Sequence, residues 1–255
     1  MPKILLIANT DWFLYNFRYA LVHELREQGH EVVLVSPSGR FAPRLQADGF
    51  RWLPWKLQRR SVAPWQEIFS FLHILRIYRQ EKPDLVHHHT IKAVLYGSLA
   101  AILVDNVKVI NSISGQGYVF TGSDLKATLI RNLMGPFYRY ALRTSSSAVI
   151  FENPGDRQFF FDQDFITLEN SWLIEGVGAD PQRFSPRPEP PKPIVVLMAA
   201  RTLWEKGVGV FVEAARMLHQ RVQVRMVLVG EPDPGNPGTL DKTTLKDWHR
   251  QGVIE

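Results

Sequence analysis

The stretch KILLIANTDWFLYNFRYALVHELREQGHEVVLVS, residues 3–36, decides the fold class. Residues 3–8 have the composition of a buried strand, residues 14–29 have helical spacing that ends at Gly29, and residues 31–36 form a second apolar run. A strand, a helix and a second strand in this order are typical of a parallel sheet covered by helices. The stretch therefore predicts an α/β protein.

The same alternation continues along the chain. Further strands are predicted at 50–55, 83–88, 107–113 and 147–152, and further helices at 64–80, 92–103 and 124–143. Five prolines between residues 186 and 193 exclude helix interior and central strand, so this segment is interpreted as a stiff linker. After the linker, strands are predicted at 194–200 and 222–231, and helices at 207–220 and 243–252.

This pattern predicts two domains of the same class. We expect a doubly wound Rossmann-like domain at 1–185, the linker at 186–193, and the start of a second Rossmann-like domain at 194–255. The second domain has two strong strands, whereas a stable doubly wound domain needs several more. The chain is therefore expected to end inside its second domain.

Composition narrows the function classes. The chain has 255 residues, 45% hydrophobic and 22% charged, which is typical of a folded globular protein. It has no cysteine, which excludes disulfides and zinc–thiolate sites and favours a reducing compartment. The N-terminus does not resemble a secretory signal, and no apolar run approaches the ~20 residues of a membrane span. We expect a cytoplasmic protein, peripheral on the inner face of the plasma membrane.

The charge favours an anionic partner. The formal net charge is +5 and the sequence pI is about 9.5. Nucleic acid, a phosphorylated substrate and an acidic lipid surface all fit this balance. The sequence contains no nucleic-acid-binding module, so nucleic acid is not expected.

Polar residues follow the first predicted strand in NTDWFLYNFR, residues 9–18. Parallel α/β sheets bind ligands at the carboxyl ends of their strands, so Asn9 and Asn16 are candidate cleft residues. The alternative is that Asn9, Thr10 and Asp11 cap the helix. No GxGxxG occurs here, so the dinucleotide fingerprint of a dehydrogenase is absent.

Three consecutive histidines end another strand, in HHHTIK, residues 87–92. In a strand, His87 and His89 point to one face and His88 to the other. We interpret His87 and His89 as lining a cleft rather than binding a metal. Lys92 opposes the dipole of the helix it opens, so contact with an anionic acceptor is one reason for its position, and solvation is the other.

Two further segments carry glycine or carboxylate patterns. Gly115 and Gly117, in SISGQGYVFTG at 112–122, would let the backbone approach a ligand, although a plain turn fits them too. The DQD at 162–164 resembles a metal-binding DxD but is interpreted as a solvated turn, because it does not end a central strand. No metal and no cofactor are expected.

The strongest candidate site follows the strand at 194–200. Arg201 and Lys206 bracket a strand-to-helix turn that ends at Gly207, and a helix N-terminus adds partial positive charge. Two phosphates would fit these groups. The alternative is a surface charge pair with Glu205.

Three segments together carry a family resemblance. With RTLWEKG (201–207), GVGADPQRFSP (176–186) and PDLVHHHTIKA (83–93), the sequence resembles glycosyltransferase family 4, the retaining nucleotide-sugar transferases with the two-domain GT-B fold. The resemblance covers the whole chain. It implies a GT-B-like, doubly wound Rossmann-like first domain that binds the acceptor, and an incomplete second Rossmann-like domain that binds the nucleotide sugar.

The resemblance also implies roles for individual residues. In the family, the arginine and lysine of an R-x4-K-G element hold the donor diphosphate, which matches Arg201, Lys206 and Gly207 and implies a nucleotide-sugar donor of the UDP type. The first domain resembles a bacterial branch that acts on lipid-linked glycan precursors. Members of the family often have histidine where this chain has Ser114. The family's later pair of glutamates, spaced eight apart, would lie beyond residue 255.

Several alternatives stay open. A GT-B sugar-nucleotide epimerase would show the same alternation, and an inactive or split-gene fragment could bind glycan or a partner chain. Because the donor site is expected to be incomplete, we expect the chain alone not to transfer sugar at a normal rate, and a companion chain could supply the rest. Aromatic and basic residues at 51–65 and 131–143 predict reversible docking on an anionic membrane, with core packing of the tryptophans as the alternative.

Overall fold

The computed structural model describes residues 1–58, 61, 63–115, 125–144, 147–181, 184–189, 191–233, 236 and 238–255. The chain forms two compact units, Met1–Ala179 and Asp180–Glu255. Each is considered by itself.

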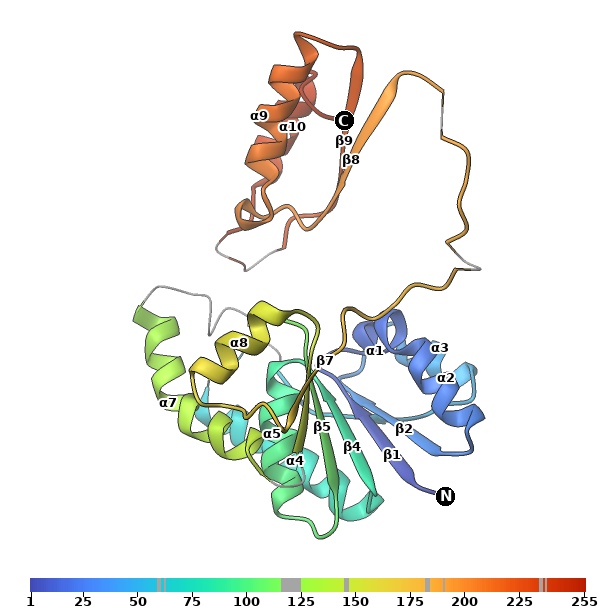
Figure 1. Ribbon diagram of the computed structural model, residues 1–255, viewed down its shortest axis with the longest axis vertical. Coiled ribbons are helices and arrows are strands. Elements are labelled where there is room, and N and C mark those ends of the chain that lie inside the picture. Colours follow the sequence, from blue (N-terminus) through green and yellow to red (C-terminus); the bar gives the residue numbers. More distant parts are fainter. Residues whose placement is uncertain are drawn as a thin grey trace. The chain divides into compact units, whose positions relative to one another are not determined.

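The first unit is built on a parallel sheet of seven strands (Figure 1). The strands are β1 (Lys3–Ile7), β2 (Glu31–Ser36), β3 (Arg51–Pro54), β4 (Leu85–His89), β5 (Lys108–Ile113), β6 (Ser147–Phe151) and β7 (Ser171–Leu173). Their order is β3-β2-β1-β4-β5-β6-β7, and every neighbouring pair is parallel. The chain order reverses between β1 and β4, which makes this the switch point where doubly wound sheets bind ligands.

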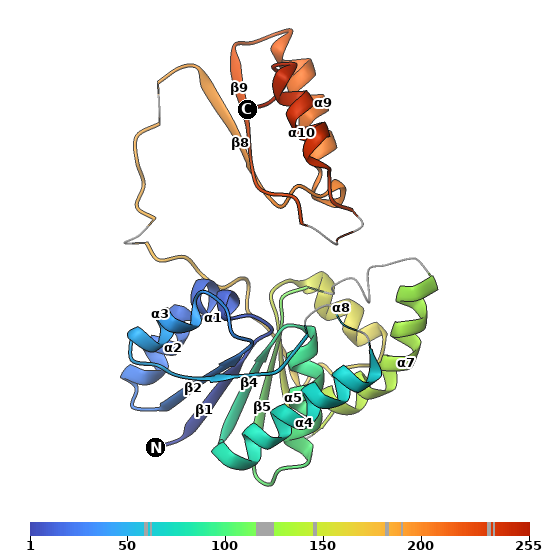
Figure 2. The same ribbon diagram turned by 180° about the vertical axis from the view of Figure 1, so that it is seen from behind.

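Helices cover both faces of this sheet, as Figures 1 and 2 show from opposite sides. The helices are α1 (Asp11–Phe17), α2 (Tyr19–Glu27), α3 (Ala42–Ala47), α4 (Pro64–Glu81), α5 (Ile91–Ile102), α7 (Leu125–Leu142) and α8 (Pro154–Asp162). On one face, Leu5, Ile7 and Val86 pack against α4 and α5. On the other face, Ile4 and Leu6 pack against α1, α2 and α3. The predicted α/β doubly wound class is confirmed.

One predicted helix is wrong in a way that matters for the site. Residues 14–29 were expected to be continuous, but α1 ends at Phe17 and α2 begins at Tyr19. Arg18 between them has φ −124° and ψ 3°, outside the helical region. The side chain of Arg18 is buried and bonded to groups at the edge of the sheet, and these tertiary contacts outweigh helix propensity.

Three short elements were not predicted, namely α3, α8 and β7. The N-terminus of α3 is held by Asp11, whose Oδ2 accepts hydrogen bonds from the amides of Phe41 and Ala42 at 2.7 and 2.8 Å. A cap that comes from thirty residues away leaves no local signal. The DQD segment is confirmed as an exposed turn: α8 ends at Asp162, and Asp164 has a φ of 58°.

The second unit is a two-stranded parallel sheet with helices. It contains β8 (Ile194–Ala199), η1 (Trp204–Lys206), α9 (Val208–His219), β9 (Val224–Val229) and α10 (Lys242–Arg250). Its core joins Val212 and Ala215 to Met226 and Ile254. The backbone of Glu255 exchanges hydrogen bonds with Met226 and Leu228, so β9 is also paired on its second edge. The apolar residues 194–197 of β8 are each 37% to 62% exposed.

In the described parts of both units, no helix combines the length and the apolar content that a membrane crossing requires.

Candidate functional site

The switch point of the first unit carries a polar cluster formed by Arg18, His89, Ser114 and Glu152. Arg18 leaves the break between α1 and α2, His89 ends β4, and Ser114 and Glu152 directly follow β5 and β6. Parallel strands bring these carboxyl ends to one edge of the sheet. Four distant parts of the sequence therefore meet where a ligand is expected.

Glu152 is the centre of this cluster. Arg18 donates from Nη2 to Glu152 Oε1 at 3.2 Å, and Ser114 donates from Oγ to the same oxygen at 2.8 Å. The side chain of Arg18 is 8% exposed and that of Glu152 is 22% exposed. Burial lowers the pKa of the Arg18 guanidinium, and its hydrogen bond to Glu152 partly opposes this. The carboxylate thus keeps a solvent-facing side while its cationic partner is buried.

The three histidines divide between the faces of β4 as predicted. His87 and His89 lie on one face with ring centroids 4.1 Å apart, and His88 lies on the other against Tyr78. Burial lowers the pKa of His87 to about 3 and that of His88 to about 4, and lowers the pKa of His89 well below its ordinary value. All three rings are therefore neutral at physiological pH.

His88 has a packing role. Its Nδ1 lies 2.8 Å from Asn111 Oδ1, and its Nε2 lies 2.6 Å from Tyr78 Oη. Because the amide oxygen only accepts, Nδ1 donates and Nε2 accepts from the tyrosine hydroxyl. Gly97 of α5 packs against this ring, and a Cβ at position 97 would lie 2.4 Å from it. Position 97 must therefore be glycine for His88 to fit. His88 thus ties β4 to α4, α5 and β5.

His89 differs because one of its nitrogens has no partner. Arg18 donates from Nε to His89 Nδ1 at 3.2 Å, so the neutral ring carries its proton on Nε2. Nε2 is buried and makes no hydrogen bond with any described residue. A buried donor without a partner costs free energy, so it marks a candidate binding group.

Thr90, the next residue, shows strain at the same point. Its φ is 78°, which is an outlier for a β-branched residue, and its buried Oγ1 has no hydrogen-bond partner among the described residues. Such strain persists only where the surroundings impose it and clusters at functional sites. His89 and Thr90 therefore strengthen the interpretation of the β4 end as part of a site.

The residues after β1 act mainly as caps. Thr10 Oγ1 accepts from the amide of Phe13 at 3.1 Å, which caps α1, and Asn16 is exposed and donates to the carbonyl of Trp12 at 2.9 Å. Asn9 is half-buried at the end of β1, beside the switch point. Asn9 and Asn16 stay predicted cleft residues, and Asn9 has the better position.

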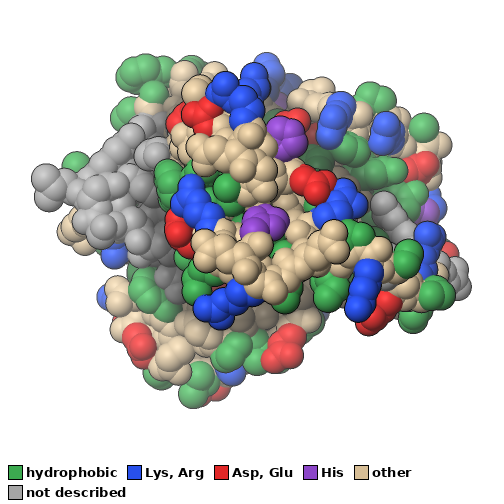
Figure 3. All heavy atoms as spheres, turned by 90° about the horizontal axis from the view of Figure 1, so that it is seen from above, with side chains coloured by type: hydrophobic (Ala, Val, Ile, Leu, Met, Phe, Trp, Pro, Cys, Tyr) green, Lys and Arg blue, Asp and Glu red, His purple; other side chains and the backbone are tan. Residues whose placement is uncertain are grey.

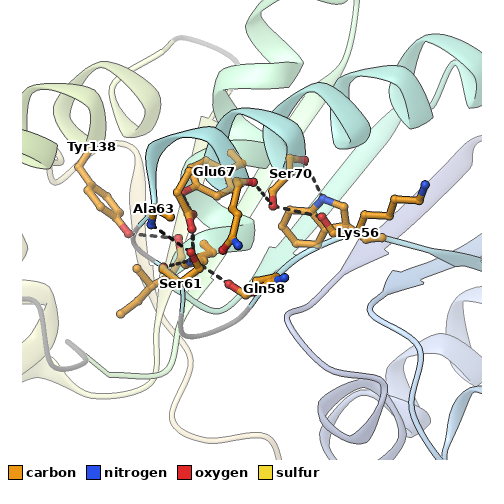
Figure 4. Close-up of polar contacts among 12 residues, drawn as sticks. Lys56, Gln58, Ser61, Ala63, Glu67, Ser70 and Tyr138 are labelled. Atoms are coloured by element: carbon orange, nitrogen blue, oxygen red, sulfur yellow. Dashed lines mark hydrogen bonds and ion pairs between the residues drawn. The ribbon is translucent and has the colours of Figure 1, made fainter.

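Lys92 is engaged within the protein. Its Nζ donates to the carbonyls of Gln58 and Ser61 at 2.9 and 2.7 Å and to both carboxylate oxygens of Glu67 at 2.8 Å. Tyr96 donates a short hydrogen bond to the same carboxylate. Figure 4 shows Gln58, Ser61 and Glu67 converging at the start of α4. Three partners already engage the three donors of Lys92, so an acceptor would have to replace one of them. The role of Lys92 with an acceptor stays a prediction.

The glycines after β5 are partly outside the described residues. Gly115 has a φ of 147°, and no atom of the described residues lies within 4 Å of a Cβ placed there. Gly117 lies outside the part of the chain that the structure describes.

The second unit presents the predicted cationic turn. Arg201 and Lys206 are both exposed, and Gly207 has φ 78° and ψ 18°, a left-handed conformation that ends η1 and precedes α9. Arg201 Nη1 lies 2.8 Å from Asp233 Oδ2, and Lys206 forms no ion pair with the described residues. The alternative pairing with Glu205 is not observed there. Two exposed cations at a helix N-terminus can bind a diphosphate.

The loop after β9 closes onto this turn. A Cβ at Gly230 would lie 1.8 Å from the carbonyl oxygen of Ala200, so the two strand ends meet backbone to backbone. Asp233 on the same loop reaches Arg201. Thr202 beside it is buried, and its Oγ1 has no hydrogen-bond partner among the described residues.

No metal site is evident in the part of the chain that the structure describes. The described residues hold no group of three or more His, Cys, Asp or Glu side chains suited to a metal ion. On the face seen in Figure 3, Lys and Arg side chains are interspersed with acidic and apolar ones.

These features define a doubly wound protein with a polar cluster at its switch point and a cationic turn in a second α/β unit. The chain belongs to the glycosyl transferase 4-like family, whose model matches residues 3–153. The predicted resemblance to glycosyltransferase family 4 and its GT-B fold is thus confirmed.

Individual relatives match at low identity. The N,N'-diacetylbacillosaminyl-diphospho-undecaprenol alpha-1,3-N-acetylgalactosaminyltransferase of Campylobacter jejuni is 25% identical over 245 residues, covering 91% of this chain and 64% of that protein. HepE of Anabaena, solved with UDP and glucose, matches with a TM-score of 0.65 and 16% identity, over 98% of this chain and 66% of HepE. The UDP-N-acetylglucosamine 2-epimerase of Rickettsia bellii matches with a TM-score of 0.55 and 12% identity, over 98% and 64%. This chain therefore spans about two thirds of each relative's length.

Proposed function

We propose that this protein takes part in the transfer of a sugar from a nucleotide-sugar donor, of the UDP type, to a lipid-linked glycan precursor. The observation that carries the donor half is the turn at 201–207, with two exposed cations and a glycine in the left-handed region. The Campylobacter relative, named for a diphospho-undecaprenol substrate, supports the acceptor class. HepE, solved with UDP and glucose, supports the donor class.

In this proposal, Arg201 and Lys206 bind the donor diphosphate and stabilise the charge that develops on it as the glycosidic bond breaks. The diphosphate would replace Asp233 as the partner of Arg201, since both are anions and the Arg201 side chain is 56% exposed. The sugar is transferred with retention, with the leaving diphosphate helping to deprotonate the acceptor hydroxyl. The role of the protein is then positioning and electrostatics.

The polar cluster is the proposed acceptor side. Glu152 can accept a hydrogen bond from a sugar hydroxyl, and His89 Nε2 and Thr90 Oγ1 are groups without partners among the described residues. The histidine ring and the threonine hydroxyl are neutral and the carboxylate is anionic, which suits hydroxyls rather than phosphate. Arg18 acts by holding Glu152 in place.

The experiment measures UDP, UMP and uridine binding by equilibrium dialysis. We expect UDP to bind more tightly than UMP, and Arg201→Ala and Lys206→Ala each to weaken UDP binding by roughly tenfold or more, since a charge-assisted hydrogen bond is worth about 1.5–3 kcal/mol. Glu205→Ala is the matched control in the same turn and should bind UDP as the unaltered chain does. Equal binding of UDP and uridine, or wild-type affinity in both cation variants, would refute the donor assignment.

A sugar-nucleotide epimerase is the second candidate, because the Rickettsia bellii epimerase shares the fold. Incubation with a UDP-sugar alone separates the two. Change of the donor without any acceptor would favour epimerisation, whereas product that forms only with a lipid-linked acceptor would favour transfer.

A further inference from the structure

Helices α4 and α7 each expose an apolar stripe that the core does not use. On α4 the stripe is Trp65, Ile68, Phe69 and Leu72, each 50% to 68% exposed; on α7 it is Leu129, Leu133, Phe137 and Tyr140, each 49% to 70% exposed. We call these eight residues the α4–α7 surface. Within each set the residues are three or four positions apart, so each set lies on one side of its helix.

These stripes are additional to the faces that pack on the sheet. Ile74 and Tyr78 of α4 are fully buried, and so are Ala141 and Leu142 of α7. Both helices are therefore apolar on two sides. Folded monomers rarely expose large contiguous apolar areas without an interaction partner, so the second side needs an explanation.

The two stripes lie in one layer of the first unit. Helices α4 and α7 flank α5 on the same face of the sheet, as both ribbon views show. Each helix follows a parallel strand and so begins at the carboxyl edge, where the polar cluster lies. The residues of the α4 stripe occupy the first turns of the helix, next to that edge.

Cations continue both stripes. Arg76 and Arg79 follow Leu72 at spacings of four and three, are exposed, and form no ion pair with the described residues. Arg139 of α7 and Arg143, which directly follows the helix, line a cavity of about 630 Å³ beside Tyr140. Both form ion pairs with Asp164, so the cations of the surface that are free of ion pairs with the described residues are Arg76 and Arg79. Aromatic and aliphatic side chains flanked by arginine are typical of helices that lie at a membrane interface.

The start of α4 is held firmly in place. Lys92 and Tyr96 of α5 hold Glu67, and Trp55 donates from its indole nitrogen to the carbonyl of Ser70 at 2.9 Å. Figure 4 shows Glu67 and Ser70 on this first part of α4. Trp55 is only 1% exposed, so this tryptophan belongs to the core, whereas Trp65 is exposed. The exposed stripe is therefore a preformed feature of the fold.

We propose that the α4–α7 surface docks the first unit on an anionic lipid bilayer. A bilayer accepts the apolar side chains and offers negative headgroups to the flanking arginines. A second copy of the chain is a poorer partner, because a two-fold contact would bring the same arginines together. The proposal does not depend on sugar transfer and would hold if the proposed function failed.

The test is flotation of the purified chain with lipid vesicles. We expect binding to phosphatidylcholine vesicles that contain phosphatidylglycerol, weaker binding to phosphatidylcholine alone, and release by added salt. Arg76→Gln with Arg79→Gln should lower the partition coefficient by roughly fivefold per arginine. Trp65→Ser with Phe69→Ser should lower it on both kinds of vesicle.

The control is Val210→Ser with Met217→Ser in α9, because these residues are exposed to a similar extent in the second unit. It should bind vesicles as the unaltered chain does. Circular dichroism must show that every variant is folded. The separate pair Leu129→Ser with Leu133→Ser repeats the test on α7, so the proposal stays open to refutation if an α4 variant unfolds.

Three results would overturn the proposal. The first is no binding to anionic vesicles at low salt. The second is equal loss in the α9 control, which would mean that any exposed apolar residue contributes. The third is a stable dimer in light scattering that the α4 and α7 substitutions dissociate while vesicle binding is unchanged, which would assign the surface to a second copy.

Discussion

Acidification should destabilise the first unit, because three consecutive histidines are buried in neutral form. Burial holds the pKa of His87 at about 3 and that of His88 at about 4, and keeps that of His89 well below its ordinary value. In the unfolded chain each titrates near its ordinary value of ~6.5. Between these values the unfolded chain binds protons that the folded chain does not, so stability is complete above ~6.5 and is lost as the pH falls.

The magnitude follows from these shifts. Each histidine contributes about 1.4 kcal/mol per pH unit once the pH lies below its unfolded value. At about pH 5.5 the three together should lower the free energy of unfolding by roughly 4 kcal/mol relative to neutral pH. His73 adds to this in the same direction, since burial and nearby cations lower its pKa. A loss of this size is a large fraction of the total stability of a domain.

The assay is urea unfolding at a series of pH values, with hydrogen exchange of peptides from β4 and β5 to assign the change to the first unit. In His88→Gln one titrating group is lost, so the slope of the unfolding free energy against pH should fall by roughly a quarter to a third. The variant's lower absolute stability does not affect this comparison. A free energy of unfolding that stays constant between neutral pH and about pH 5.5 would refute the reasoning, because buried neutral histidines require that slope.

Three further substitutions follow from single contacts. Glu152→Ala should cost about 3 kcal/mol, because it leaves the buried Arg18 charge without its partner, and urea unfolding of the variant beside Arg18→Met would show whether the pair is coupled. Gly230→Ala should lower the unfolding temperature of the second unit, since the new Cβ would lie 1.8 Å from a backbone oxygen; an unchanged melt would contradict this packing. Lys92→Met should speed hydrogen exchange at the start of α4 by releasing Glu67, and exchange at the wild-type rate would show that the ion pair is unimportant there.

The fold class could be predicted because it depends on patterns that are local in sequence. The apolar runs at 3–8 and 31–36 and the helix between them are visible as composition and spacing, and the structure has β1 and β2 there. Elements fixed by distant partners gave no such signal. Helix α3 is six residues long and begins where the Asp11 carboxylate accepts two amides, so its cause lies outside its own sequence.

The candidate site divides in the same way. The turn at Arg201, Lys206 and Gly207 is contiguous, so its spacing could be interpreted directly, and the structure gives Gly207 the left-handed backbone that the turn needs. Arg18 and Glu152 were not predicted as site residues, although Glu152 is the last residue of the strand predicted at 147–152. Their pairing is a contact between residues 134 apart, which no local pattern encodes.

The break at Arg18 explains how the fold assembles the polar cluster that we propose as the acceptor side. If the helix that begins at Asp11 were continuous, Arg18 would have helical backbone angles. Its φ is −124° instead. The break lets its guanidinium bond to both His89 and Glu152. Because Arg18 donates to Nδ1 of His89, the proton of that ring is fixed on Nε2, the atom that has no partner among the described residues. Burying the Arg18 guanidinium costs free energy, as its lowered pKa indicates, and a helix break alone does not require it. In the proposed function this cost has a reason, because Arg18 orients His89 Nε2 and holds the Glu152 carboxylate, the two groups that would bind the acceptor.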